Sequence, residues 1–220
     1  MNIFTSENLT LCRTLAQSLL EDSFFPHQAL KNLKQFITET GKGLDPAVYE
    51  KKEEGIWIAR SAKISSSANI CAPCIIGENT ELRHCAYIRG SVIIGNGCVV
   101  GNSTEVKNSI IFDEAQIPHY NYVGDSILGY RAHLGAGAIT SNVKSDKTNV
   151  TTDYGSEKIE TGLKKLGSII GDCVEVGCGA VLNPGTVVGK GARVYPLSSV
   201  RGYVPPDSIY KSSNDITPIL

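Results

Sequence analysis

The sequence predicts a mainly β protein, a left-handed parallel β-helix built on a hexapeptide repeat, with a short N-terminal helical segment. The first observation is a period of six, at which ten of eleven positions are strongly apolar: Ile58, Ile64, Ile70, Ile76, Leu82, Ile88, Ile94, Val100, Val106, Phe112 and Pro118. The second is the glycine that follows several of these residues, as in IIG at 75–77 and VVG at 187–189. Neither a helix nor an alternating strand has a period of six, so we expect three hexads to form each triangular coil.

Residues 1–52 are expected to form the helical segment. Spacings of i, i+3, i+4 and i+7 predict one short amphipathic helix that contains Cys12, Leu15, Ala16 and Leu19. A second helix is predicted to begin at Pro26 and to end near Gly41 and Gly43. Its apolar side carries Leu30, Leu33, Phe36 and Ile37. Two such helices cannot bury these faces alone, so we expect them to pack on the rest of the chain or on another copy.

Residues 53–204 are expected to form the β-helix. After Pro118 the phase slips twice by one residue, through Val123 and Leu128, and it is lost over residues 143–168 before it returns at Ile170. The repeats predict about seven coils, stacked about 4.8 Å apart. Residues 143–168 form a polar insertion with five lysines, which is either a binding loop or a solvated excursion. Residues 205–220 are expected to be a C-terminal tail.

Composition excludes several classes of function. A net charge of −1 argues against a nucleic-acid-binding surface. No apolar run approaches the ~18 residues of a membrane span, and the N-terminus lacks the pattern of a signal peptide. Seven cysteines, an odd number, favour a reduced, cytoplasmic protein. The pair Cys71 and Cys74 lacks a second CxxC. A zinc site that resembles the one of γ-class carbonic anhydrase needs two histidines about five residues apart, and Gly124 stands at that distance from His119, so no metal site is expected.

Two cations are predicted to stack on one corner of the coil. Arg89 follows Ile88 and Lys107 follows Val106, eighteen residues later, which places them in adjacent coils. Like charges about 5 Å apart repel each other unless an anion or a carboxylate joins them. Glu105 is one candidate partner. Arginine and lysine together favour a phosphate, so we expect an anion-binding site here rather than a solvated pair.

His119 is expected to stand in an exposed groove. It follows Pro118, and its predicted stacking neighbours are Gly101 below and Gly135 above, which leave the imidazole uncovered. A lone histidine is more often structural than catalytic. The nearby hydroxyl of Tyr122 and the cationic corner favour a functional role.

These motifs carry a family resemblance. The segments VGNSTEVKNSIIF at 100–112 and PHYNYVGDSILGYRAHLGAGAITSN at 118–142 resemble the acetyltransferase half of bacterial bifunctional glucosamine-1-phosphate acetyltransferase/N-acetylglucosamine-1-phosphate uridyltransferase. The chain is still more similar to archaeal sugar-1-phosphate nucleotidyltransferase/acetyltransferases, which share an insertion ending as TGLKKLGSIIG does at 161–171. The resemblance covers about residues 56–205. It implies a homotrimer of left-handed β-helices with active sites between subunits.

The resemblance also implies roles for individual residues. His119 matches the general base, Arg89 and Lys107 match the groups that hold a sugar phosphate, and Tyr122 and Asn142 match sugar-binding positions. Glu105 lies near the sugar, and Lys147 lies close to an inserted lysine that reaches a neighbouring subunit. Cys178 aligns with a serine near the reactive end of the coenzyme, whose phosphates are expected to meet Lys190, Arg193 and Arg201. The family's asparagine eleven residues after the tyrosine is replaced here by His133.

The function expected from this resemblance is acetyl-CoA-dependent N-acetylation of an amino-sugar phosphate such as glucosamine-1-phosphate, in nucleotide-sugar synthesis. Acetyl-CoA would be a substrate, and no tightly bound cofactor is expected. Neutral His119 would remove the proton from the amine as nitrogen attacks the thioester. Uridyltransferase activity is not expected, because residues 1–55 carry no Gly-rich, Rossmann-like sequence. Two alternatives stay open: a non-catalytic regulatory or scaffold β-helix, and acylation of another sugar or a nucleotide-linked sugar.

Overall fold

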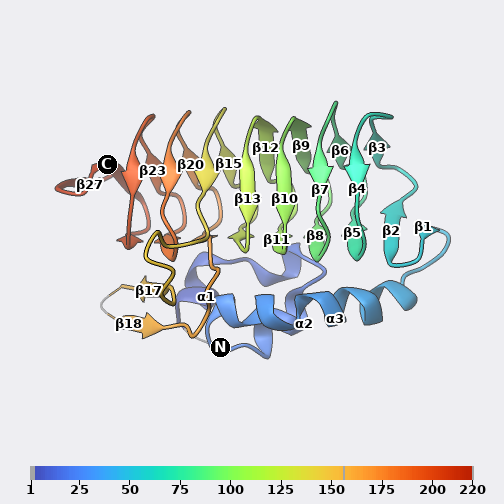
Figure 1. The fold of residues 1–220 in the computed structure, drawn as a ribbon, viewed down its shortest axis with the longest axis horizontal. Coiled ribbons are helices and arrows are strands. Elements are labelled where there is room, and N and C mark those ends of the chain that lie inside the picture. The colour runs from blue at the N-terminus through green and yellow to red at the C-terminus, as the bar shows by residue number, and fades with distance from the viewer. Residues whose placement is uncertain (1–2, 156, 220) are drawn as a thin grey trace.

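The computed structural model describes residues 3–155 and 157–219. Residues 1–2, 156 and 220, which the expected segments 1–52, 143–168 and 205–220 include, lie outside the described residues. The chain winds into a parallel β-helix whose axis runs horizontally in Figure 1. The predicted parallel β-helix with an N-terminal helical segment is therefore confirmed.

Three sheets form the sides of the coil, here called A, B and C. In the described residues sheet A has nine strands: β1 (Tyr49–Glu53), β2 (Ile56–Ala59), β5 (Cys74–Ile76), β8 (Val92–Ile94), β11 (Ser109–Ile111), β14 (Ile127–Leu128), β19 (Ser168–Ile170), β22 (Thr186–Val188) and β25 (Tyr203–Val204). Sheet B also has nine: β3 (Lys63–Ile64), β6 (Glu81–Leu82), β9 (Val99–Asn102), β12 (Gln116–His119), β15 (His133–Leu134), β20 (Glu175–Val176), β23 (Arg193–Val194), β26 (Ser208–Ser212) and β27 (Asp215–Pro218).

Sheet C has seven strands among the described residues: β4 (Asn69–Ile70), β7 (Tyr87–Ile88), β10 (Glu105–Lys107), β13 (Tyr122–Gly124), β16 (Ile139–Thr140), β21 (Val181–Leu182) and β24 (Ser199–Val200). Pairing within the coils is parallel, whereas β1 joins β2 and β27 joins β26 antiparallel at the two ends. The residues expected as a tail thus include β26, which continues sheet B beside β23 and buries Tyr210 in the interior. The stack has about eight coils, slightly more than the repeats predict.

The predicted position of the first phase slip is wrong. Partners Ile76 and Ile94 lie eighteen residues apart, but Ile94 pairs with Ile111, only seventeen residues later. The slip therefore falls before Ile111, and the interior positions are Ile111 and Ile117 rather than Phe112 and Pro118. Because neighbouring strand residues face opposite sides, Phe112 points outward and is buried under the N-terminal segment.

The N-terminal segment covers sheet A. It contains α1 (Ile3–Asn8), η1 (Leu11–Arg13), α2 (Gln17–Glu21), η2 (Pro26–Gln28) and α3 (Ala29–Lys42), which run along the lower side of the coil in Figure 1. The prediction of one helix through Cys12 and Leu19 is wrong, because Thr14 is extended and interrupts it. Cys12 and Leu15 are consequently exposed, whereas Ala16 and Leu20 are buried. The second predicted helix is confirmed by η2 and α3, whose Leu33 and Ile37 are buried.

The insertion folds as an antiparallel hairpin of β17 (Thr151–Tyr154) and β18 (Glu157–Glu160). Its Tyr154 ring lies 5.2 Å from the rings of both Phe4 and Phe25, so the hairpin packs on the N-terminal segment. The solvated-excursion interpretation therefore holds for the exposed residues 145–149 but not for Tyr154, which is buried. No helix among residues 3–155 and 157–219 has the length and apolar character needed to cross a membrane.

Candidate active site

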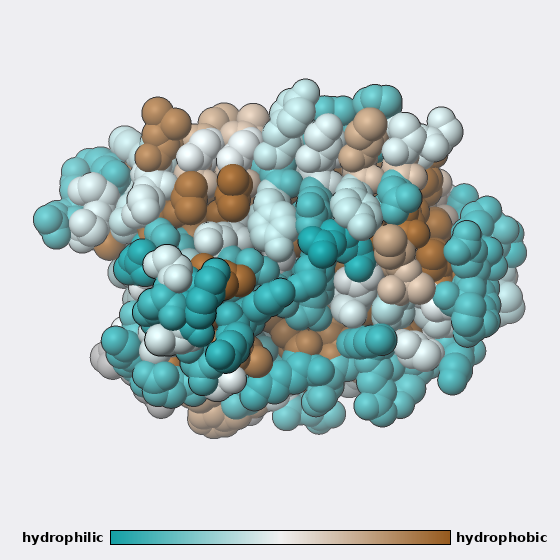
Figure 2. Space-filling view, in the orientation of Figure 1, coloured by the Kyte–Doolittle hydropathy of each residue, from teal (hydrophilic) through white to brown (hydrophobic). Residues whose placement is uncertain are grey.

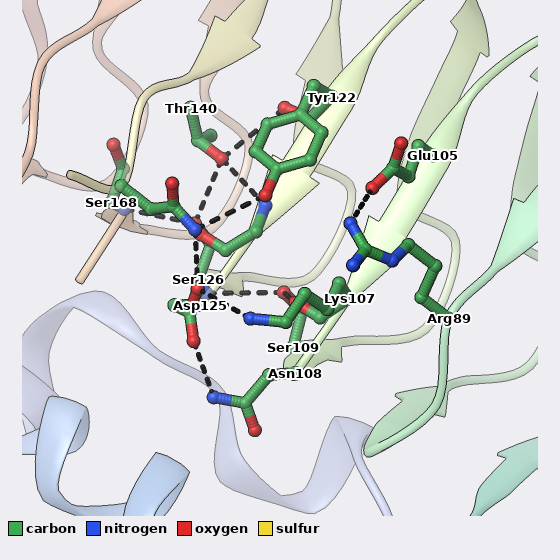
Figure 3. Close-up of polar contacts among 12 residues, drawn as sticks. Arg89, Glu105, Lys107, Asn108, Ser109, Tyr122, Asp125, Ser126, Thr140 and Ser168 are labelled. Carbon is green, nitrogen blue, oxygen red and sulfur yellow. Dashed lines mark hydrogen bonds and ion pairs between the residues drawn. The ribbon is translucent and has the colours of Figure 1, made fainter. Parts of the chain in front are cut away.

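Five of the predicted site residues converge beside sheet C. Arg89 follows β7, Glu105 and Lys107 lie in β10, Tyr122 begins β13, and Asn142 follows β16. These strands are successive neighbours in sheet C, with Glu105 paired to Tyr87 on one side and to Tyr122 on the other. Figure 3 shows their side chains beside sheet C, with Arg89 and Glu105 as one pair and Lys107, Tyr122 and Asn142 in a separate network around Asp125.

The two stacked cations do not share one anion in this structure. The backbone N–H of Arg89 donates to the carbonyl of Val106, which confirms that Arg89 and Lys107 lie on adjacent coils. Each cation nevertheless has its own carboxylate: Arg89 contacts Glu105 at 2.6 Å, and Lys107 Nζ lies 3.3 Å from Asp125 Oδ2. The Glu105 side chain is 31% exposed and that of Asp125 is 7% exposed. An incoming anion can therefore displace Glu105 from Arg89 more easily than Asp125 from Lys107.

Asp125 is a member of the network that sequence reasoning missed. Its carboxylate accepts hydrogen bonds from Asn108 Nδ2 at 2.8 Å and from Asn142 Nδ2 at 2.5 Å, in addition to the contact with Lys107. The residue lies within the segment 118–142 that carries the family resemblance, but no role was assigned to it. The signal was its spacing: Asn108, Asp125 and Asn142 recur every seventeen residues and so occupy one corner of three successive coils.

Tyr122 is the first residue of β13, and its hydroxyl reaches Asn142, which follows the neighbouring strand β16. Its Oη accepts a hydrogen bond from Asn142 Nδ2 at 3.2 Å. Burial, and then the negative charges of Asp125 and Glu105, raise the pKa of Tyr122 above its ordinary value. The phenol is therefore protonated at neutral pH, and its O–H is available to donate to a ligand.

The two ends of the insertion meet directly beside this network. Insertion residues leave the coil after Asn142, whose carbonyl accepts from the N–H of Leu166 at 3.0 Å. The next residue, Gly167, donates its N–H to the carbonyl of Asp125 at 2.9 Å. Ser126 Oγ then accepts the N–H of Ser168 at 3.0 Å. The return of the chain into β19 is thus fixed by the same residues that form the site.

His119 lies at the opposite edge of sheet C, at the corner where β12 of sheet B ends. Its predicted exposure is confirmed, but its predicted neighbours are wrong: it pairs with Asn102 rather than Gly101, because the phase slip comes earlier than expected. The carbonyl of His119 accepts from Gly137 N–H at 2.9 Å, so Gly135 is not its neighbour above. The imidazole makes no hydrogen bond with any residue that the structure describes, so both ring nitrogens are open to a ligand.

The remaining predicted residues are dispersed over the molecule. Lys147 is an exposed insertion residue with a φ of 61°. Cys178 is exposed at the corner after β20. The three expected phosphate contacts lie on three sides of the coil: Lys190 after β22 of sheet A, Arg193 in β23 of sheet B, and Arg201 after β24 of sheet C. One chain therefore does not gather Lys190, Arg193 and Arg201 into a single site.

His133, the departure from the family pattern, lines a separate cleft on sheet B. Its Nδ1 lies 2.7 Å from Glu175 Oε2, and the cleft between Gln116, Arg131 and these two residues has a volume of about 320 Å³. In the part of the chain that the structure describes, no three His, Cys, Asp or Glu side chains are grouped so as to hold a metal ion.

Residues 70–212 match the family model described as the GMPPB C-terminal domain. The matched range covers well over half of the chain. The chain belongs to this family. The matched range contains all the polar residues described beside sheet C, together with His119 and Cys178. It excludes the N-terminal segment.

Curated relatives of this family member include two long bifunctional proteins. The chain is 35% identical over 111 residues to the "Bifunctional sugar-1-phosphate nucleotidylyltransferase/acetyltransferase" of Sulfurisphaera tokodaii, which covers 50% of this chain and 28% of the relative. It is 37% identical over 109 residues to the "Bifunctional protein GlmU" of Methanococcus maripaludis, which covers 50% of this chain and 26% of that protein. The matches thus span about a quarter of the length of these relatives.

The chain is also similar to a shorter relative and to a solved structure. The "Uncharacterized acetyltransferase YaiX" of Escherichia coli is 31% identical over 172 residues, which are 70% of this chain and 74% of that protein. The crystal structure of a perosamine N-acetyltransferase mutant from Caulobacter crescentus, in complex with CoA and GDP-perosamine, is similar over 73% of this chain and 54% of its own, with 18% identity and a TM-score of 0.35.

Proposed function

We propose that this member of the GMPPB C-terminal domain family is an acetyl-CoA-dependent N-acetyltransferase that acts on an amino-sugar phosphate such as glucosamine-1-phosphate, in nucleotide-sugar synthesis. The observation that carries the proposal is the convergence of Arg89, Lys107, Tyr122 and Asn142 beside sheet C. A phosphate takes the place of the Glu105 carboxylate at Arg89, and the sugar hydroxyls bind Tyr122 and Asn142. The names of the Sulfurisphaera tokodaii relative and of YaiX both include the word acetyltransferase, which supports the acyl-transfer class.

His119 acts as the general base in this proposal. An amine is protonated and not nucleophilic near neutral pH, and an exposed imidazole can take its proton as nitrogen attacks the thioester. The N–H groups of Gly135 and Gly137 are already bonded to Val176 and His119 carbonyls, so they are not free to bind the developing oxyanion. The backbone N–H of Cys178 donates to no described residue, and it is the donor we propose for that oxyanion.

The proposed assembly is a homotrimer with sites between subunits. The dispersal of Lys190, Arg193 and Arg201 over three sides supports it, because the coenzyme phosphates meet several of them only where two copies adjoin. In this assembly Lys147 reaches toward the site of a neighbouring copy. All seven cysteines are free, which supports the proposed location in the reducing cytoplasm.

A non-catalytic β-helix is the second candidate function. Arg89 and Lys107 are already neutralised by Glu105 and Asp125, and no described side chain orients the His119 ring. A regulatory or scaffold protein would keep such internal pairs without binding a substrate. Acetyl-CoA binding and turnover separate the two candidates.

A thiol-release assay with acetyl-CoA tests the proposed function against a panel of amino-sugar phosphates and nucleotide-linked amino sugars. We expect turnover by the wild type and a loss of roughly 10²–10⁴-fold in kcat for His119→Ala. The matched control is His84→Ala, because His84 is an exposed histidine on the same corner two coils away, hydrogen-bonded to Ser67. Absence of turnover with every acceptor, together with absence of acetyl-CoA binding by calorimetry, would favour the scaffold function.

A further inference from the structure

Asp125 is a buried carboxylate to which the proposed reaction assigns no role. The residue is 5% exposed, yet its two oxygens receive three nitrogen donors, from Lys107, Asn108 and Asn142. A buried carboxylate is costly unless such donors satisfy it, so the network is built around this charge.

The Asp125 carboxylate determines the orientation of the Asn142 side-chain amide. An ionised carboxylate only accepts hydrogen bonds, so the Asn142 atom that faces Asp125 must be the NH₂ group. The same NH₂ group donates to Tyr122 Oη. Asn142 Oδ1 therefore points away from Asp125, and it accepts no hydrogen bond from the residues that the structure describes.

The orientation of Asn142 in turn determines what Tyr122 offers to a ligand. Because Tyr122 Oη accepts from Asn142, its O–H proton is directed elsewhere. Lys107 is held on the same carboxylate as a cation. The surface beside sheet C thus presents one acceptor at Asn142, one donor at Tyr122 and one positive charge at Lys107.

We propose that Asp125 is a positioning residue that sets this donor and acceptor pattern and thereby the affinity for the acceptor substrate. The inference deepens the proposed function and rests on it for the identity of the substrate. In the proposed reaction Asp125 touches no reacting atom, and it acts through Lys107, Asn142 and Tyr122.

Asp125→Asn removes the charge without disturbing the backbone. The backbone bonds to Lys107 and Gly167 do not involve the side chain, and asparagine tolerates the φ of 49° at this corner. The new amide cannot accept from all three donors, so Asn142 loses its fixed orientation. We expect the KM for the acceptor to rise roughly 10- to 100-fold, with a smaller change in kcat.

A second measurement does not depend on activity. The negative charge of Asp125 contributes to the raised pKa of Tyr122. In a titration of ¹³C-tyrosine-labelled protein followed by NMR, Asp125→Asn should lower the pKa of Tyr122 relative to the wild type. The exchanged double variant Asp125→Asn/Asn142→Asp returns a negative charge beside Tyr122 and should raise the pKa of Tyr122 again. It should not restore the acceptor KM, because a carboxylate at position 142 only accepts and takes the O–H of Tyr122.

The matched control is Asp172→Asn. Asp172 is 1% exposed and also receives three donors, two from Thr10 and one from Tyr130, but it lies between sheet A and the N-terminal segment. Its substitution should lower the melting temperature and leave the acceptor KM and the pKa of Tyr122 unchanged. The positioning role is overturned if Asp125→Asn behaves like Asp172→Asn in both measurements. If the wild type acetylates no acceptor, the proposed function fails, and the Tyr122 titration alone decides whether Asp125 controls the network.

Discussion

At the residue scale, His27 shows how burial changes the chemistry of a side chain. It is 1% exposed, its ring packs against those of Phe25 and Tyr154, and its Nδ1 is 2.9 Å from Tyr154 Oη. Burial, and then the positive charge of Lys31, lower the pKa of His27 from 6.5 to about 4. The folded protein therefore keeps this imidazole neutral where the unfolded chain protonates it.

Stability should consequently fall as the pH drops from 6.5 toward 4. In that window the unfolded chain binds a proton at His27 that the folded chain does not, so acid favours unfolding. Urea unfolding at several pH values should show a shallower decline for His27→Gln, which cannot titrate. His84→Gln, a change at an exposed histidine, should keep the wild-type slope. Identical slopes for all three proteins would assign the acid sensitivity to other groups.

The individual site residues could be predicted from the sequence only in part. The repeat and the family resemblance together identified Arg89, Lys107, Tyr122 and Asn142, which the structure brings together beside sheet C. The repeat gives the order of stacked positions but not the rotamers, so it could not decide between an anion and two separate carboxylates. Asp125 lies eighteen residues after Lys107 and seventeen after Asn108, but the repeat does not tell which way its side chain turns, so its contacts with both were missed.

At the element scale, the period of six predicted the coils more accurately than the positions at which the phase of the repeat shifts. Ile111 and Phe112 are adjacent apolar residues, so either one satisfies the pattern when a coil is one residue short. The structure selects Ile111 for the interior, and the larger Phe112 fills the space between sheet A and the N-terminal segment. Apolarity alone does not distinguish these two buried sides.

The inserted hairpin and the N-terminal segment should stabilise each other. Tyr154 is buried between Phe4 and Phe25, so Tyr154→Ala leaves a cavity and removes the hydrogen bond to His27. We expect a loss of about 3–5 kcal/mol in the free energy of unfolding, measured in urea. Amide hydrogen exchange should become faster in residues 3–28.

The control for this prediction is Phe24→Ala. Phe24 belongs to the same segment but is largely exposed, so its loss should cost about 1 kcal/mol, the worth of its contact with the Phe25 ring. Equal losses in the free energy of unfolding for the two variants would mean that the hairpin does not stabilise the N-terminal segment.

At the scale of the whole molecule, the outward residues indicate which side of the coil is covered. On sheet A the outward positions are uniformly apolar: Ile75, Ile93, Ile110, Ile127, Ile169 and Val187. On sheet B the corresponding residues are mostly polar, as at Glu81, Gln116 and Arg193. A search at one coil length, rather than at six residues, would have predicted the covered side. The sequence could not predict the fold of the cover itself, because its helices are short and irregular.

The open corner between sheets B and C is the surface we expect the proposed trimer to use. Exposed apolar side chains occur there at Tyr120, Tyr195 and Leu197, and Leu197 is 85% exposed. Figure 2 shows hydrophobic side chains on the coils near the C-terminal end, above the hydrophilic surface of the hairpin and the N-terminal segment. With sheet A covered, a second copy can approach the coil closely only from sheets B and C.

Leu197→Asp should therefore dissociate the assembly without unfolding the chain. Leu197 has a φ of 58°, a conformation that aspartate tolerates better than leucine, so the substitution does not strain the coil. Light scattering should give about three times the chain mass of 23.6 kDa for the wild type and the single mass for the variant. Acetyl transfer should fall with the trimer if the proposed sites between subunits are correct. Leu15→Asp, which places the same charge on an exposed leucine of the N-terminal segment, should remain trimeric. A monomeric wild type would contradict the trimer, and a trimeric Leu197→Asp would move its interface away from this corner.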